Sequence, residues 1–245
     1  MPMFPRYTQL AIINQTTDIS DIDASNMVLA LNSLLPIFCS DWFIPLVTTV
    51  YIPRNTKALP EKSYFIFLQD TSDVQGALAY HDLSSDIPYG KVFAKTVLEN
   101  NGVIVYESTL TKSTVAQALS HEAFELLIDP RCNTWWMNLT TGQLVAAEVS
   151  DPVENNIVEV TLPSGLKVGM CDWILPSWSD VQNTTGPFNH LNTLTEPFQL
   201  KNGYLMVINN SKVITVYGET VNPIVNTHSQ LGERSSKRLA SVKPI

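Results

Sequence analysis

The segment from Ser113 to Asp129 constrains the fold of this 245-residue chain more than any other part of it. It contains no glycine or proline, and either Ser113 or Thr111 can cap its amino end. The pair Asp129-Pro130 ends the segment, because a residue that precedes proline avoids helical geometry. The sequence therefore predicts a long helix over Ser113–Asp129.

One stripe of this helix is polar. With about 100° of rotation per residue, its four ionisable side chains share an arc of roughly 100°, and most of the remaining surface is apolar. These side chains are His121, Glu122, Glu125 and Asp129. A solvent-exposed face would show the same pattern, but no lysine or arginine accompanies the acids between Lys112 and Arg131. We therefore interpret the stripe as the wall of a cleft.

His121 and Glu125 stand one helical turn apart in the pattern HExxE, so both side chains can reach a single metal ion. Glu122, beside the histidine, is placed to act as a general base toward water. The pattern has the logic of HExxH with the second histidine replaced by glutamate, and a carboxylate favours harder cations than an imidazole does. The sequence predicts His121 and Glu125 as ligands of Zn²⁺ or another divalent cation, and Glu122 as the catalytic base.

Hydrophobic periodicity predicts an α+β order of elements around this helix. A second helix is expected at Ser20–Phe38, ending near Pro36. Strands are expected at Leu10–Asn14, Phe43–Ile52, Tyr64–Gln69, Ala77–His81, Lys91–Leu98 and Val103–Ser108, with the turn-rich run DLSSDIPYG joining two of them. Gln143–Ser150 is expected to be a short helix or a strand. Residues 156–218 are expected to form strands with turns at 163–165 and 209–211.

The composition fits one globular domain at residues 1–228, in which residues 1–130 hold a sheet and two helices and residues 131–228 form a β-rich lower part. The net charge is −8, and residues 229–245 form a basic flexible tail in this interpretation. The acidic body repels a nucleic-acid backbone, so nucleic acid is not expected as a partner.

Two features bear on the location of the protein. No apolar run reaches the 18 residues of a membrane span, and the amino end lacks the features of a signal peptide. We therefore expect a cytoplasmic or virion protein with no membrane partner. The three widely spaced cysteines, Cys39, Cys132 and Cys171, are expected to be free thiols.

Several ordered blocks resemble a group of uncharacterised phage, viral and bacterial proteins. The blocks are GALAYHDLSSDIPYGKVFAK, ALSHEAFELLIDP, AAEVSDPVE, VGMCDWILPSW, FNHL and PFQLKNGY, and the resemblance covers roughly residues 64–206. The group shares SHExxExxxDP and EVxDPV blocks, and by motif its members look like zincin-type metallopeptidases. The chain departs from the shared pattern at Cys171, where serine is usual, and at Trp178-Ser179, where Trp-Phe is usual.

The resemblance implies a zincin-like α+β fold. Such a fold has a twisted mixed sheet with a backing helix and a metal-binding helix, and here a small β-rich C-terminal part would follow. An edge strand such as Lys91–Leu98 would pair with an extended peptide by strand addition. Candidates for contacting the substrate or stabilising an oxyanion are Tyr80, His81 and His190.

A third metal ligand is expected downstream of the helix. Asp129 lies roughly 12 Å from His121 along the helix axis, which makes it a helix terminator and not a ligand. Glu148 follows Glu125 by 23 residues, which resembles the zincins whose third ligand is a glutamate on a later helix. Asp151 is either that ligand or a partner that orients the histidine.

The sequence is compatible with two functions from different classes. The first is a metal-dependent peptide hydrolase that acts on a peptide or protein substrate. The alternative is a non-catalytic, virion-associated or interaction protein that keeps a zincin-like fold and contacts other virion or viral proteins. In that alternative the acidic stripe is structural or binds metal only for stability.

Overall fold

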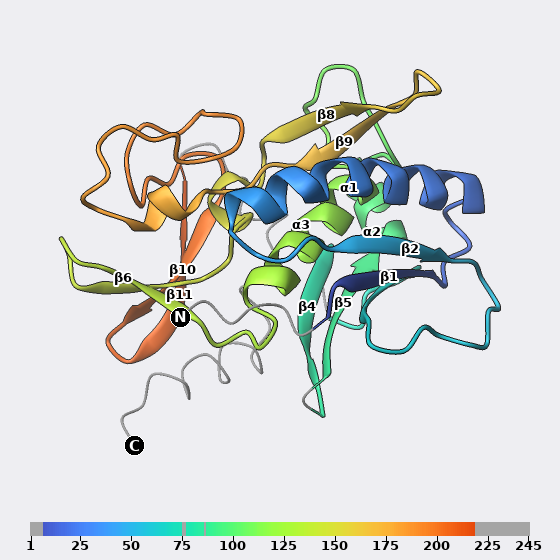
Figure 1. Cartoon of the computed structure of the whole chain (residues 1–245), viewed down its shortest axis with the longest axis horizontal. Coiled ribbons are helices and arrows are strands. Elements are labelled where there is room, and N and C mark those ends of the chain that lie inside the picture. The colour runs from blue at the N-terminus through green and yellow to red at the C-terminus, as the bar shows by residue number, and fades with distance from the viewer. Residues whose placement is uncertain (1–6, 75–76, 86, 219–245) are drawn as a thin grey trace.

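The structure is a computed structural model that describes residues 7–74, 77–85 and 87–218 (Figure 1). The predicted basic tail, residues 229–245, and the last ten residues of the predicted domain lie outside this part of the chain. The described residues form an α+β protein with a five-stranded mixed sheet, two longer helices, one short helix and a β-rich C-terminal part, which confirms the predicted fold class at this level.

The five-stranded sheet has the order β2-β1-β3-β5-β4. Its strands are β1 (Gln9–Asn14), β2 (Thr48–Ile52), β3 (Tyr64–Gln69), β4 (Ala79–Ser84) and β5 (Ile87–Phe93). β1, β2, β3 and β5 run parallel to one another, while β4 pairs antiparallel with β5 and forms one edge. Alternate side chains of β1 and β3, such as Leu10, Ile12 and Ile66, are buried in the main core on the face that packs against the helices.

Helix α1 (Asp21–Asp41) begins at Ser20, whose hydroxyl accepts a hydrogen bond from the Asp23 amide at 3.0 Å. The prediction that it ends near Pro36 is wrong: the proline ring is exposed, and the helix continues because Phe38 and Cys39 beyond it are buried. By length and composition alone α1 could cross a membrane, but half of its most apolar window is buried inside the protein, as in a core helix.

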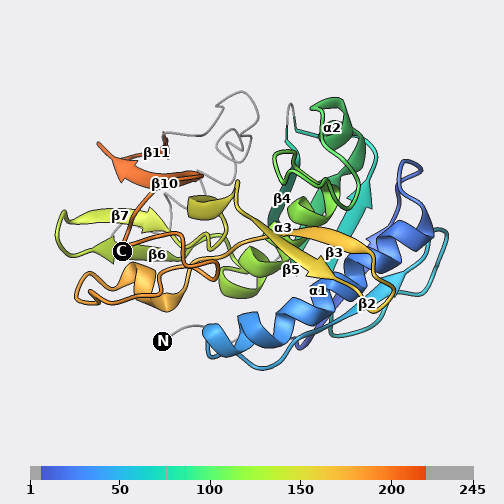
Figure 2. The same cartoon turned by 90° about the horizontal axis from the view of Figure 1, so that it is seen from above.

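Helix α3 (Val115–Ile128) is the predicted Ser113–Asp129 helix. Thr114 caps it by accepting from the Gln117 amide at 2.7 Å, and Gln117 completes a capping box, so the cap is Thr114 and not Ser113 or Thr111. The helix lies between the sheet, at β4 and β5, and the hairpin of β8 (Ile157–Thr161) and β9 (Lys167–Cys171) (Figure 2). It is therefore buried on almost every side.

The two long helices pack on the same side of the sheet. Phe38 of α1 stacks on Phe124 of α3 with ring centroids 4.4 Å apart, and both rings meet the Trp173 indole edge to face. This aromatic cluster belongs to the main hydrophobic core. It fixes the position of α3, so that the helix presents its polar stripe to β4 and to residues 148–151.

The C-terminal part is built of the strands that periodicity predicts, with one addition. β6 (Trp135–Asn138), which was not predicted, and β7 (Gln143–Ala146) join β10 (Tyr204–Asn209) and β11 (Lys212–Tyr217) in a sheet of order β11-β10-β7-β6. The segment 143–150 is thus a strand followed by a loop. Single-turn helices, η1 (Asp151–Val153) and η2 (Pro176–Ser179), lie between the strands.

Three strand predictions are wrong in their boundaries or their type. Lys91–Leu98 is not one strand, because β5 ends at Phe93 and helix α2 (Ala94–Glu99) follows it; short apolar runs do not distinguish a strand from a helical turn. Phe43–Ile52 shrinks to β2, since Phe43 has a positive φ of 53°. Val103–Ser108 forms only an isolated bridge between Val103 and Thr114.

The turn-rich run at 82–90 is mostly strand. Asp82 pairs with Tyr89 and Leu83 pairs with Pro88, so β4 and β5 form a hairpin instead of two strands joined by a loop. The true edge strand is consequently β4 and not the predicted Lys91–Leu98. This correction places His81 within the edge strand, next to α3.

Candidate metal centre

The polar stripe of α3 faces the interior. His121, Glu122 and Glu125 are at most 3% exposed, although Glu and His usually remain in contact with water. Burying ionisable groups is costly unless they are paired, hydrogen bonded or bound to a metal. The stripe is therefore not a solvent face, and its burial calls for a partner.

His121 and Glu125 meet a third group from outside the helix. The His121 Nε2 atom lies 3.2 Å from Glu125 Oε1 and 3.2 Å from Asp151 Oδ1. Asp151 opens the single turn η1 and is 1% exposed. These three side chains place one nitrogen and two carboxylate oxygens within 4.8 Å of one another, which is a geometry that can hold a metal ion.

A second group of the same kind shares Glu125. His81 of β4 has its Nδ1 atom 3.2 Å from Glu122 Oε2 and 3.6 Å from Glu125 Oε2, and its Nε2 atom 3.8 Å from Glu148 Oε2. His81, Glu125 and Glu148 again offer ligand atoms that all lie within 4.8 Å. The structure thus brings Glu148 into the cluster beside His81, and it brings Asp151 beside His121.

The other nitrogen of His121 faces a cysteine. Cys171 Sγ lies 3.8 Å from His121 Nδ1, and the Cys171 amide donates to Ser120 Oγ at 2.8 Å. Burial raises the pKa of the Cys171 thiol, so the sulfur stays protonated. The contact helps to orient the imidazole with Nε2 toward the carboxylates. All three cysteines are free thiols and are buried.

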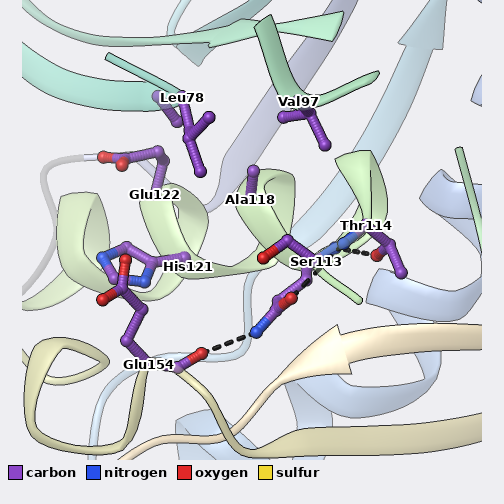
Figure 3. Close-up of a pocket in the computed structure, with 10 residues that line it drawn as sticks. Leu78, Val97, Ser113, Thr114, Ala118, His121, Glu122 and Glu154 are labelled. Carbon is purple, nitrogen blue, oxygen red and sulfur yellow. Dashed lines mark hydrogen bonds between the residues drawn. The ribbon is translucent and has the colours of Figure 1, made fainter. Parts of the chain in front are cut away.

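A pocket opens beside this cluster (Figure 3). It is lined by His121 and Glu122 of α3, by Leu78 and Ala79 at the start of the edge strand, by Glu154 after η1, and by the residues Val97, Ser113, Thr114, Gln117 and Ala118. Figure 3 shows the Glu154 carboxylate turned toward the His121 ring and Glu122 on the side of Leu78. His121 and Glu122 thus line the same small pocket, next to the first ligand group.

The crowding of acids changes their proton affinity. Burial and then the nearby Asp151 and Glu148 carboxylates raise the pKa of Glu125 well above its ordinary value. Burial raises the pKa of Glu154 to about 7. The pKa of His121 is raised well above its ordinary value, because the surrounding carboxylates outweigh the opposing effect of burial. The protein without a cation therefore retains protons that a bound cation would displace.

The donor set fits a divalent cation. Imidazole nitrogen with carboxylate oxygen is the ligand chemistry of Zn²⁺ and related transition metals, and the buried groups come from separate, ordered elements. His121 and Glu125 are held by the helix, while Asp151 is fixed at the start of η1. The residues present can hold such an ion.

Two other predicted substrate contacts lie elsewhere. The Tyr80 hydroxyl lies 3.1 Å from the Asp73 carboxylate and its ring packs with Phe93, on the opposite face of β4 from His81. The His190 ring stacks on Trp173 with centroids 4.0 Å apart. The structure therefore places neither side chain in the two ligand groups, and it makes His81 part of the cluster itself.

Asp129 has the role that its spacing predicts. It is the C-cap of α3, and its carboxylate accepts hydrogen bonds from the Asn133 amide at 3.1 Å and from Thr134 Oγ1 at 2.8 Å. It orders the loop that leads to β6 and lies outside both ligand groups.

Comparison of the chain with protein-family models, with curated proteins and with solved structures found no match. Function is therefore inferred from the side chains and their geometry, because a fold alone does not establish an activity.

Proposed function

We propose that this protein is a metal-dependent hydrolase of peptide bonds. The observation that carries the proposal is the buried group of His121, Glu125 and Asp151, with Glu122 next to it on the wall of an open pocket. The order of elements supports it, since a helix and a mixed sheet precede the HExxE helix, as the zincin resemblance implies. In this proposal Asp151 is the third ligand of the catalytic ion, in place of Glu148.

Each residue of the centre would have a separate role in the reaction. His121, Glu125 and Asp151 would hold the cation, which supplies Lewis-acid chemistry when bound. Glu122 would take a proton from the attacking water at Oε1, since its Oε2 atom lies 3.2 Å from His81 Nδ1. The same carboxylate would then deliver that proton to the leaving amine. His81 would orient Glu122 through this contact.

An extended peptide suits the pocket better than a compact ligand. β4 has only β5 as a neighbour in the described sheet, so its outer edge can accept a further strand, and Leu78 and Ala79 at its start line the pocket. A substrate chain added there would pass over His121 and Glu122. Residues on this edge would bind the peptide mainly through its backbone.

The test is cleavage of a diverse peptide library by the full chain supplied with Zn²⁺ or Mn²⁺. We expect the wild type to cleave and Glu122→Gln to lose about 100-fold or more in rate, because the general base is removed, while its metal content is unchanged. Glu99→Gln on the exposed surface of α2 is the matched control and should keep the wild-type rate.

Two outcomes would count against the hydrolase. Equal rates for the wild type and Glu122→Gln would show that the cleavage does not arise from this centre. Stoichiometric metal in a wild-type protein that cleaves nothing would favour the non-catalytic alternative, in which the ion serves stability or binding.

A further inference from the structure

We propose that the centre holds a second divalent cation, bound by His81, Glu125 and Glu148, with Glu125 bridging the two ions. The inference rests on the proposed metal centre and deepens it, because it turns a single-ion site into a two-ion site. The two ligand groups, His121–Glu125–Asp151 and His81–Glu125–Glu148, are equivalent in kind: each combines one imidazole with two carboxylates.

The orientation of the Glu125 carboxylate is the first argument. Its Oε1 atom faces His121 at 3.2 Å, whereas its Oε2 atom faces His81 at 3.6 Å. One oxygen is thus directed to each ligand group. A carboxylate in this position can give one oxygen to each of two cations, which is how a two-ion hydrolytic site can be joined.

The charge balance is the second argument. A divalent ion at His121 would offset the charges of Glu125 and Asp151 only, while Glu122 and Glu148 add two further carboxyl groups to the same buried cluster. Ionised carboxylates that are at most 2% exposed are costly to bury without a nearby positive charge. A second divalent ion at His81 and Glu148 supplies that charge.

Ordered structure also holds the ligand group of His81, Glu125 and Glu148 in place. His81 lies in the β4–β5 ladder opposite Gly90, and its carbonyl accepts from the Cys132 thiol at 3.6 Å. Glu148 lies two residues beyond the end of β7, and its amide donates to the Ala146 carbonyl at 2.9 Å. Because β4, α3 and the end of β7 each contribute one ligand, the group requires the assembled fold. The sequence motif on α3 alone would not reveal it.

Metal stoichiometry tests the inference. The full chain is stripped with a chelator, dialysed against Zn²⁺ or Mn²⁺ in separate experiments, and its bound metal is measured by mass spectrometry. We expect two ions per chain in the wild type and one in Glu148→Gln and in His81→Gln. Glu125→Gln should retain at most a weakly bound ion, since it removes the shared ligand. Glu154→Gln, which alters a nearby carboxyl outside both groups, is the matched control and should keep two.

The metal content of the wild type and the variants distinguishes a failure of the second site from a failure of the proposed function. One ion in the wild type, lost in His121→Gln and kept in Glu148→Gln, would overturn the second site and leave the hydrolytic site intact. No bound metal in the wild type would overturn both. If the variants at His81 and Glu148 do not fold, anomalous diffraction from wild-type crystals decides, because it counts the ions directly.

Discussion

At the scale of single residues, the candidate metal centre consists of side chains that the fold brings together, and only part of these contacts can be predicted from the sequence. The HExxE spacing was enough to place His121, Glu122 and Glu125 together, since helical geometry fixes that relation. Asp151 and Glu148 were both recognised as candidates, but their positions depend on how β7 and η1 pack against α3. The sequence predicts His81 only as a substrate contact. It does not show that His81 lies near Glu125, because that proximity follows from the pairing of β4 with β5.

The clustering of these groups makes the stability of the metal-free protein depend on pH. The pKa values of Glu125 and Glu154 are raised in the folded chain above the ordinary carboxyl value of 4.5. At a pH between the ordinary and the raised pKa, the folded chain retains a proton that the unfolded chain has released. His121, with a pKa raised above 6.5, acts in the same direction. All three therefore stabilise the fold at low pH, and this stabilisation is lost as pH rises.

We expect the melting temperature of the metal-free protein to fall between pH 5 and pH 8, by roughly 2–4 °C for each kcal/mol of stability that is lost. Saturating Zn²⁺ should oppose the fall, because it binds the deprotonated ligands, so the difference between the two melting temperatures widens with pH. Differential scanning calorimetry of both forms measures this. A metal-free melting temperature that rises over the same range would contradict the assignment of the buried cluster.

At the scale of elements, α3 shows what local sequence can and cannot determine. Its extent was predicted within two residues at each end, because a glycine-free and proline-free segment bounded by Pro130 leaves few alternatives. The hairpin of β4 and β5 and the short helix α2 were missed, since the run at 82–90 is rich in turn-forming residues and Val97 fits a strand or a helix equally well. Pairing with β3 and burial against α3 decide those segments.

The cap of α3 links this element to the β8–β9 hairpin. The Thr114 hydroxyl accepts from the Gln117 amide and donates to the Gly169 carbonyl, each at 2.7 Å. Removing it in Thr114→Ala should cost about 1–2 kcal/mol of unfolding free energy, because one buried acceptor and one helix amide lose their partner. Thr114→Ser keeps the hydroxyl and should lose less than half as much. Urea denaturation compares the two, and equal losses would show that the cap is not the stabilising contact.

At the scale of the whole molecule, the predicted combination of a mixed sheet, two helices and a β-rich C-terminal part is present. Composition and periodicity were sufficient for this level, since both depend on patterns that extend over many residues. The way in which the C-terminal part closes on α3 was not predictable, because it depends on contacts between distant segments such as Trp173 with Phe124 and β9 with α3. Those contacts bring Asp151 to His121.

The central claim is that His121, Glu125 and Asp151 bind a divalent cation, and anomalous diffraction at the zinc absorption edge tests it most directly. Crystals of the full chain grown with Zn²⁺ should show an anomalous peak bound by His121 Nε2, Glu125 Oε1 and Asp151 Oδ1, at the usual zinc–ligand distances of about 2.0–2.2 Å. Crystals with no peak among these three side chains, in which His121 Nε2 stays about as close to the two carboxylates as it is without metal, would contradict it.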